Sequence, residues 1–163
     1  MKKLIVVLHC LEMLALAAWV GGLITIIAAV IPAVFNTVAM EAGGRMLTRT
    51  FQGYDRIVLS AAGLIVMGML TRAIAGGRWR AQIGMAELIV FGTMLVIAAY
   101  LALAWNPHML ILQERAFAAQ DPVVRQMALH DFFVGHQVAR ALYLLNFGFG
   151  IALICMRVSK WAR

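Results

Sequence analysis

Residues 4–33 read LIVVLHCLEMLALAAWVGGLITIIAAVIPA, an apolar run in which Glu12 is the single charged side chain. A second run, residues 88–113, carries no charged side chain at all. The hydrocarbon core of a bilayer is about 30 Å thick, and roughly 20 apolar helical residues are needed to cross it. Both runs exceed that length, so the sequence predicts an integral membrane protein built from helices.

The rest of the chain has the same character, with a mean hydropathy of +0.90 over 163 residues. Charged residues make up 13%, about half the share that is usual in a soluble domain, and they cluster between apolar blocks. We therefore predict an all-α fold, a single domain with four transmembrane helices, over a fold with two spans and re-entrant segments. The predicted helices are residues 4–33, 54–75, 85–105 and 136–156, with amphipathic outer segments at 37–53 and 108–135.

The placement of lysine and arginine predicts the orientation, because these residues favour the cytoplasmic side of a membrane. With an inner N-terminus, the inner segments are purely basic, whereas acidic residues offset the arginines of the outer segments. Both termini are therefore predicted to be cytoplasmic. The first helix is predicted to be retained, because its apolar run is too long for a signal peptide. The basic residues assigned to the inner side are Lys2, Lys3, Arg72, Arg78, Arg80, Arg157, Lys160 and Arg163.

The formal net charge of +7 fits attraction to anionic lipid headgroups. It does not indicate a nucleic-acid partner, because no basic face remains free of the membrane. The expected partners are the lipid bilayer and other membrane protein subunits.

Ionisable side chains inside membrane-spanning helices are costly and often functional. His9 and Glu12 share a helix face, and Glu87 lies at a similar depth near the start of the third helix. With Cys10, these side chains could bind copper or zinc, or His9 could ligate a haem iron. The alternatives are hydrogen bonds from His9 and Glu12 to each other or to a neighbouring helix, and a proton path. Cys10 projects about 100° away from His9 around the helix, which disfavours a compact site.

On the predicted outer side, His130 and His136 are candidate ligands, but their spacing does not place them on one helix face. Capping and bridging of loops is the plainer interpretation. Arg140 lies one turn inside the fourth helix, where we expect it to form a structural ion pair with Asp55, or alternatively with Glu114. No phosphate-binding loop, nucleophile elbow or paired-carboxylate motif is present in the sequence, which favours a non-catalytic protein.

Several segments resemble a bacterial four-helix membrane family of unknown function, grouped with the transmembrane protein 205-like domain. They are LAAWVGG (16–22), Pro32, AGGRMLTRTFQGYDR (42–56), AYLALAWNPHMLILQERA (99–116) and DPVVRQMALH (121–130). This resemblance covers about residues 12–130 and implies a multi-pass protein of the bacterial cytoplasmic (inner) membrane without settled chemistry. The opening LHCLEMLALAAWVGG is also similar to the first helix of copper-resistance D proteins and of J-type haem-binding protoporphyrinogen oxidase. That more distant likeness implies that His9 is a haem or metal ligand.

Three functions remain open on these observations. The first is a non-catalytic accessory protein or subunit of a larger membrane complex. The second is a haem b- or copper-binding protein in electron transfer or metal handling, with His9 as ligand. The third is a small proton-coupled transporter that uses Glu12 and Glu87. No repeat between the two halves of the chain can be demonstrated from the residues alone.

Overall fold

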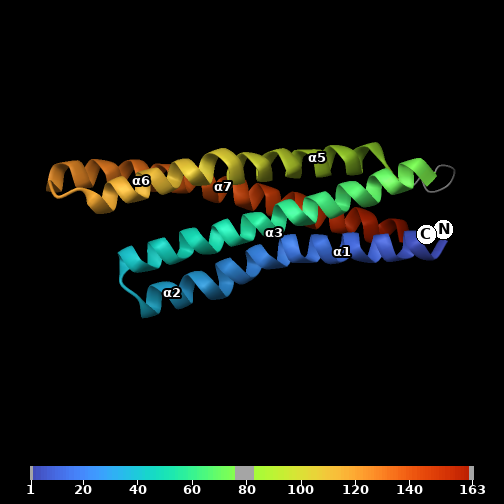
Figure 1. Cartoon of the computed structure of the whole chain (residues 1–163), viewed down its shortest axis with the longest axis horizontal. Helices are drawn as coiled ribbons and strands as arrows, with labels where there is room; N and C mark the ends of the chain where they lie inside the picture. The colour runs from blue at the N-terminus through green and yellow to red at the C-terminus, as the bar shows by residue number, and fades with distance from the viewer. Residues whose placement is uncertain (1, 76–82, 162–163) are drawn as a thin grey trace.

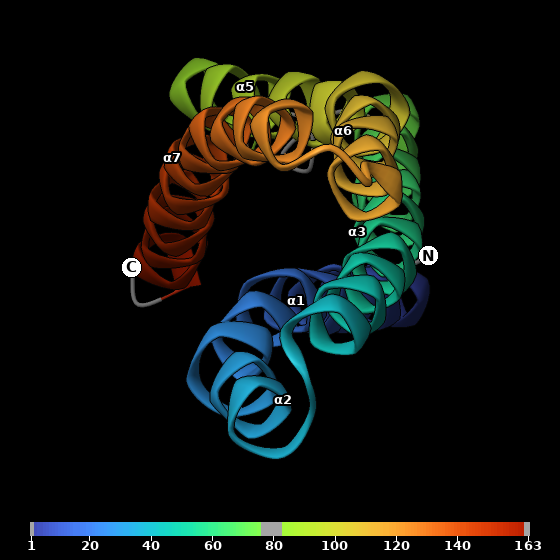
Figure 2. The same ribbon diagram turned by 90° about the vertical axis from the view of Figure 1, so that its left-hand side faces the viewer.

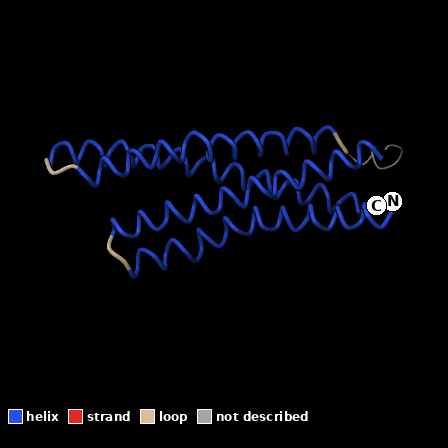
Figure 3. Tube along the Cα trace, in the orientation of Figure 1, coloured by secondary structure: helices blue, strands red, loops and turns tan. Residues whose placement is uncertain are grey.

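The computed structural model describes residues 2–75 and 83–161, which are helical almost throughout and contain no strand (Figures 1 and 3). The described residues include four helical runs that are long and apolar enough to cross a membrane, at Val6–Thr37, Met40–Ala75, Met85–Ala118 and Pro122–Lys160. The predicted all-α membrane fold is thus confirmed. The elements in chain order are α1 (Lys2–Thr25), η1 (Ile26–Val30), α2 (Ile31–Thr37), α3 (Met40–Ala75), α5 (Met85–Tyr100), η2 (Leu101–Trp105), α6 (Asn106–Ala118) and α7 (Pro122–Trp161).

The helices extend further than the predicted spans. The predicted amphipathic segment 37–53 is largely the first part of α3, and segment 108–135 is divided between α6 and the start of α7. Two short breaks separate these helices. Val38 is extended after α2, and the Asp121 carboxylate caps α7 by accepting a hydrogen bond of 2.7 Å from the backbone N–H of Val123.

Pro32 and Pro107 do not end their helices, because each follows a five-residue π-helical stretch. Proline has no N–H to donate to the α-helical ladder, and a π-helical turn changes the hydrogen-bonding pattern just before it. Pro32 then lies in the first turn of α2 and Pro107 in the first turn of α6, where no donor is needed. The first and third helical runs therefore continue past residues 33 and 105, where the predicted spans end.

The helices form two hairpins, one of α1, η1, α2 and α3 and the other of α5, η2, α6 and α7. Figure 1 shows that the hairpins meet at the end where α1 begins and α7 ends, and diverge toward the other end. We call these the closed end and the open end. Because α1 begins and α7 ends together, the chain enters and leaves the bundle on one side; that this side is cytoplasmic stays a prediction. Arg78, Arg80 and Arg163, which were assigned to that side, lie outside the described residues.

The second hairpin repeats the first in element order and in spacing. The interval from Glu12 to Glu87 equals the interval from Ile26, where η1 begins, to Leu101, where η2 begins. It also equals the interval from Pro32 to Pro107. Both halves run in the same direction from the closed end (Figure 1), which is the arrangement of parallel repeats in membrane proteins.

The core lies where the two hairpins meet. Leu16 on α1, Ile65 on α3, Met94 on α5 and Leu153 on α7 are fully buried there. Two polar side chains cross the core to backbone carbonyls: the Tyr54 hydroxyl donates to Trp19 at 2.8 Å, and the Asn146 amide donates to Met94 at 2.9 Å. Large apolar side chains on the outer faces are exposed, as expected for helices that contact lipid.

We predict that Gly150→Ala lowers the midpoint of thermal unfolding in detergent, because a Cβ at Gly150 would lie 2.6 Å from the Val20 side chain of α1. Overpacking of this kind typically costs about 1–3 kcal/mol. Gly148→Ala is the matched control on the same helix, since nothing lies within 4 Å of the added Cβ. Equal midpoints for the two variants would contradict close packing of α7 on α1.

Candidate functional site

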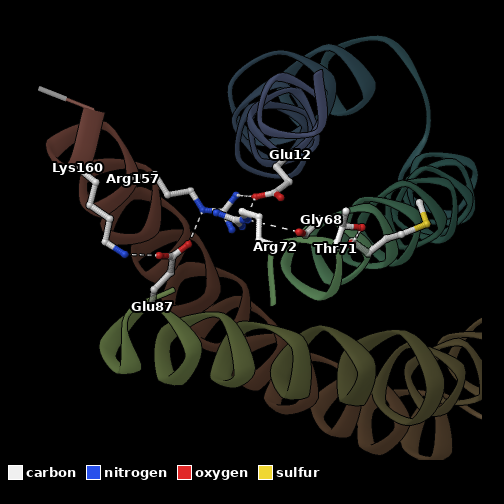
Figure 4. A network of polar contacts seen from close by, with 8 residues as sticks. Glu12, Gly68, Thr71, Arg72, Glu87, Arg157 and Lys160 are labelled. Atoms are coloured by element: carbon white, nitrogen blue, oxygen red, sulfur yellow. Dashed lines mark hydrogen bonds and ion pairs between the residues drawn. The ribbon is translucent and has the colours of Figure 1, made fainter. Parts of the chain in front are cut away.

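Near the closed end, each spanning run contributes one charged side chain to the interior of the bundle (Figure 4). Glu12 comes from α1, Arg72 from α3, Glu87 from α5 and Arg157 from α7. All four residues are at most 4% exposed. We call them, together with Lys160 on α7, the closed-end network.

Arg157 is the centre of this network. Its Nη1 lies 2.7 Å from Glu12 Oε2, and its Nε lies 2.9 Å from Glu87 Oε1. Arg72 Nη2 approaches the same Glu12 oxygen at 2.8 Å, and Lys160 Nζ lies 2.6 Å from Glu87 Oε2. Arg157 therefore connects the carboxylate of one hairpin to that of the other.

The charges of the four buried residues cancel. Removing an ion from water costs several kcal/mol even after the protein relaxes, and only well-placed partners offset this cost. Lys160, whose side chain is 38% exposed, adds one positive charge at the border of the network. The geometry therefore indicates a structural latch, in which every buried carboxylate is held by a cation.

Gly68 on α3 makes room for the Glu12 carboxylate, which would overlap a side chain at that position. The Gly68 carbonyl also accepts a hydrogen bond from Arg72 Nε at 3.4 Å. A close approach of α1 and α3 at this glycine thus brings Glu12 and Arg72 together.

Two arginines of the network are buried, which their assignment to the inner side did not predict. Arg72 and Arg157 both lie between the helices at the closed end. The physical reason is that Glu12 and Glu87 lie at the same level and require positive partners there. The sequence predicted that Glu12 and Glu87 lie at a similar depth. In the structure, Arg157 forms an ion pair with each of them.

The predicted metal ligands His9, Cys10 and Glu87 are not gathered into one group. His9 is half-buried on α1, Cys10 is exposed, and Glu87 is engaged by Arg157 and Lys160. Within the described residues, no group of three or more His, Cys, Asp or Glu side chains could hold a metal ion.

The predicted ion pair of Arg140 with Asp55 is not formed. Asp55 is buried and instead accepts hydrogen bonds from the Asn106 amide at 2.6 Å and the Tyr143 hydroxyl at 3.2 Å. These two donors satisfy the carboxylate without a cation. The alternative partner, Glu114, pairs with Arg45 at 3.4 Å. Arg140 is exposed and forms no ion pair within the described part of the chain.

A cavity of about 480 Å³ lies between the hairpins in the open half of the bundle. All four spanning runs contribute apolar side chains to its wall, among them Leu23, Phe35, Leu47, Met109 and Phe133. A few polar side chains, including Gln113, His136 and Arg140, interrupt this apolar lining. We call it the open-end cavity.

The two outer histidines, His130 and His136, have different surroundings. His136 lines the open-end cavity and stacks on Phe132 with ring centroids 6.1 Å apart. His130 is exposed and does not belong to the cavity wall. The structure therefore does not join them in one site.

Gln113 was not among the predicted site residues. This side chain is 1% exposed, and its Oε1 accepts a hydrogen bond of 2.6 Å from the Thr48 hydroxyl. Its Nε2 is buried and has no hydrogen-bond partner in the described part of the chain. In the sequence, the signal that could have pointed to Gln113 is the presence of a polar amide in the charge-free run 88–113.

We predict that Arg157→Leu strongly lowers the thermal unfolding midpoint in detergent, because it leaves two buried carboxylates short of a partner. Breaking a buried ion pair by removing one partner typically costs about 3–5 kcal/mol. The control is Arg125→Leu on the same helix, which removes an exposed pair with Glu41 (3.0 Å, side chains 49% and 53% exposed). Such exposed pairs contribute about 0–1 kcal/mol, so comparable losses in both variants would refute the latch.

We also predict that Gly68→Ala destabilises the bundle, because the added methyl group would displace the Glu12 carboxylate from Arg72 and Arg157. Gly63→Ala, on the same helix with nothing within 4 Å of the new Cβ, should leave stability unchanged or raise it slightly. Thermal unfolding of both variants in the same detergent measures the difference. A Gly68→Ala protein as stable as Gly63→Ala would show that the carboxylate has room to move.

Comparison with known proteins gives one match. Residues 14–118 match a domain of unknown function, DUF4149. No curated protein and no solved structure matches the chain. The match agrees with the predicted membrane family of unknown function, without supporting the finer likeness to the transmembrane protein 205-like domain or to haem-binding proteins. The chain thus belongs to the DUF4149 family.

Proposed function

We propose that this protein is a non-catalytic membrane protein that binds the acyl chain of a lipid in the open-end cavity. The observation that carries this proposal is the cavity itself, about 480 Å³ in volume and lined mainly by apolar side chains. Pockets of about 300–1,000 Å³ with a few placed polar groups are typical ligand sites. An apolar chain fits this lining better than a polar substrate does.

The position of the cavity along the bundle supports a ligand from one leaflet. At about 1.5 Å per helical residue, Pro32 lies about 30 Å from Glu12, which is close to the thickness of the hydrocarbon core. The closed-end network therefore falls near one border of the membrane, and the open-end cavity, which extends from Leu23 to Phe35 along the first run, lies in the opposite half. A lipid would reach the cavity from the leaflet at the open end.

A lateral opening gives such a chain a route. α2 packs on α3 and α7 packs on α6, whereas no comparable contact joins α2 to α7 in the described part of the chain. Figure 2 views the bundle from its open end, with α2 and α7 on different sides of the central space. Residues on both sides of this gap, Phe35 on α2 and Phe133 on α7, line the cavity and are partly exposed.

The other predicted functions receive less support. Glu12 and Glu87 are held by arginines, which suits a latch better than the repeated protonation that proton-coupled transport requires. Haem b or copper binding at His9 receives no support from a group of three or more His, Cys, Asp or Glu side chains among the described residues. The role of accessory subunit stays a prediction and is compatible with lipid binding.

We predict that Leu47→Trp reduces lipid retention, because Leu47 lines the cavity and a larger side chain would occupy it. Native mass spectrometry of the protein purified in mild detergent measures the bound lipid directly. Leu64→Trp is the matched control, since Leu64 lies on the same helix but lines a separate shallow groove. Wild-type protein without stoichiometric lipid, or equal retention by both variants, would overturn the proposal.

A further inference from the structure

We propose that the lipid of the open-end cavity is anionic, and that Arg140 binds its phosphate or carboxylate with Gln113 and His136 as further donors. This inference rests on the proposed lipid binding and adds the chemistry of the polar end. It concerns residues of the second hairpin alone, since Gln113 lies on α6 and the other two on α7.

The first support is an uncompensated charge. Among the described residues that line the cavity, Arg140 alone carries a full charge. The acidic side chains that could reach this region have other partners: Asp55 is bound by Asn106 and Tyr143, and Glu114 by Arg45. Arg56 is likewise without an ion pair to a described residue, but it lies outside the cavity, whereas Arg140 lines the cavity, where a cation is costly without a partner. A ligand anion would supply it.

The second support is the unpartnered Gln113 amide. The Thr48 hydroxyl has one proton to donate, and Gln113 Oε1 at 2.6 Å is a nearer acceptor than the Gly44 carbonyl at 3.0 Å, which leaves Nε2 as the unpartnered, donating end of the amide. The Gln113 side chain is 1% exposed, and it lines the cavity. Leaving a buried donor unsatisfied costs about 1–3 kcal/mol, so such a group normally has a partner. An acceptor on a bound molecule fits this requirement.

The third support is the arrangement of donors on the wall. His136 precedes Arg140 by one helical turn, lines the same cavity and is held in place by stacking on Phe132. These three donors come from α6 and α7, and apolar side chains from all four spanning runs form most of the wall. A molecule with an anionic head and an apolar tail matches this combination.

The test compares binding of three probes with the same acyl chain: lysophosphatidylglycerol, lysophosphatidylcholine and the free fatty acid. Dissociation constants are measured in a neutral detergent. We expect wild-type protein to bind an anionic probe about tenfold or more tightly than the zwitterionic one, since about 1.4 kcal/mol corresponds to a factor of ten. Which anionic probe binds more tightly distinguishes a phosphate from a carboxylate.

Arg140→Gln should abolish this preference, because it should lower the affinity for the anionic probe more than the affinity for lysophosphatidylcholine, whose choline already offsets the phosphate charge. The matched control is Arg56→Gln, because Arg56 is also an exposed arginine of a spanning helix without an ion pair to a described residue, but it lies outside the cavity. Gln113→Leu should weaken binding of the anionic probe in the same direction, and it provides a second readout if Arg140→Gln does not fold.

The outcomes separate the two proposals. If no probe binds to wild-type protein, the proposed lipid binding fails. If all three probes bind equally, or Arg140→Gln keeps the preference, lipid binding stands and anion recognition is overturned. Equal losses in Arg140→Gln and Arg56→Gln would also overturn it, because they would indicate general attraction to a positive surface.

Discussion

The bridge from Arg157 to both Glu12 and Glu87 is the interaction on which the arrangement of the bundle depends. Between helices in lipid, the hydrophobic effect gives little drive to associate, and apolar surfaces tolerate sliding. Buried charges do not, because a small displacement leaves an ion without its partner. With Arg72 and Lys160, this bridge ties together charged side chains from all four spanning runs at one level. At the closed end, the bridge therefore fixes both which helices are in contact and how they are aligned along their axes.

The shape of the open end follows from the position of this bridge at the closed end. Beyond the core, no comparable buried charge pair joins the hairpins in the described part of the chain, and they diverge (Figure 1). The ion pairs found there, Arg45 with Glu114 and Arg125 with Glu41, lie on the exposed surface, and the cavity between the hairpins is lined mainly by apolar side chains. A bundle latched at one end can thus hold a cavity at the other without losing its fold. This separation places stability and ligand binding in different parts of the same helices.

Charge-free runs were sufficient to predict four membrane-spanning helices, because the cost of burying charge in lipid is the strongest constraint on such a sequence. The same signal could not give the helix ends, since residues 40–53 and 122–135 remain helical where the chain becomes more polar. It also could not locate Arg72 and Arg157. An arginine that extends to the headgroups and one that is buried against a carboxylate occupy the same position in sequence, near a helix end. Only the packing of Glu12 and Glu87 distinguishes them.

The repeat clarifies which features are shared by the two halves and which belong to one. Glu12 with Arg72 in the first hairpin corresponds to Glu87 with Arg157 in the second, so the latch is built twice. Toward the open end, the halves differ: Asp55 precedes Arg72 by the same interval at which Arg140 precedes Arg157. Asp55 is buried with two donors, whereas its counterpart Arg140 lines the cavity without an ion pair to a described residue. Asp55 and Arg140 thus stand at the same distance along their helices from an arginine of the latch, and a bound anion would give Arg140 the partner that Asp55 has in Asn106 and Tyr143.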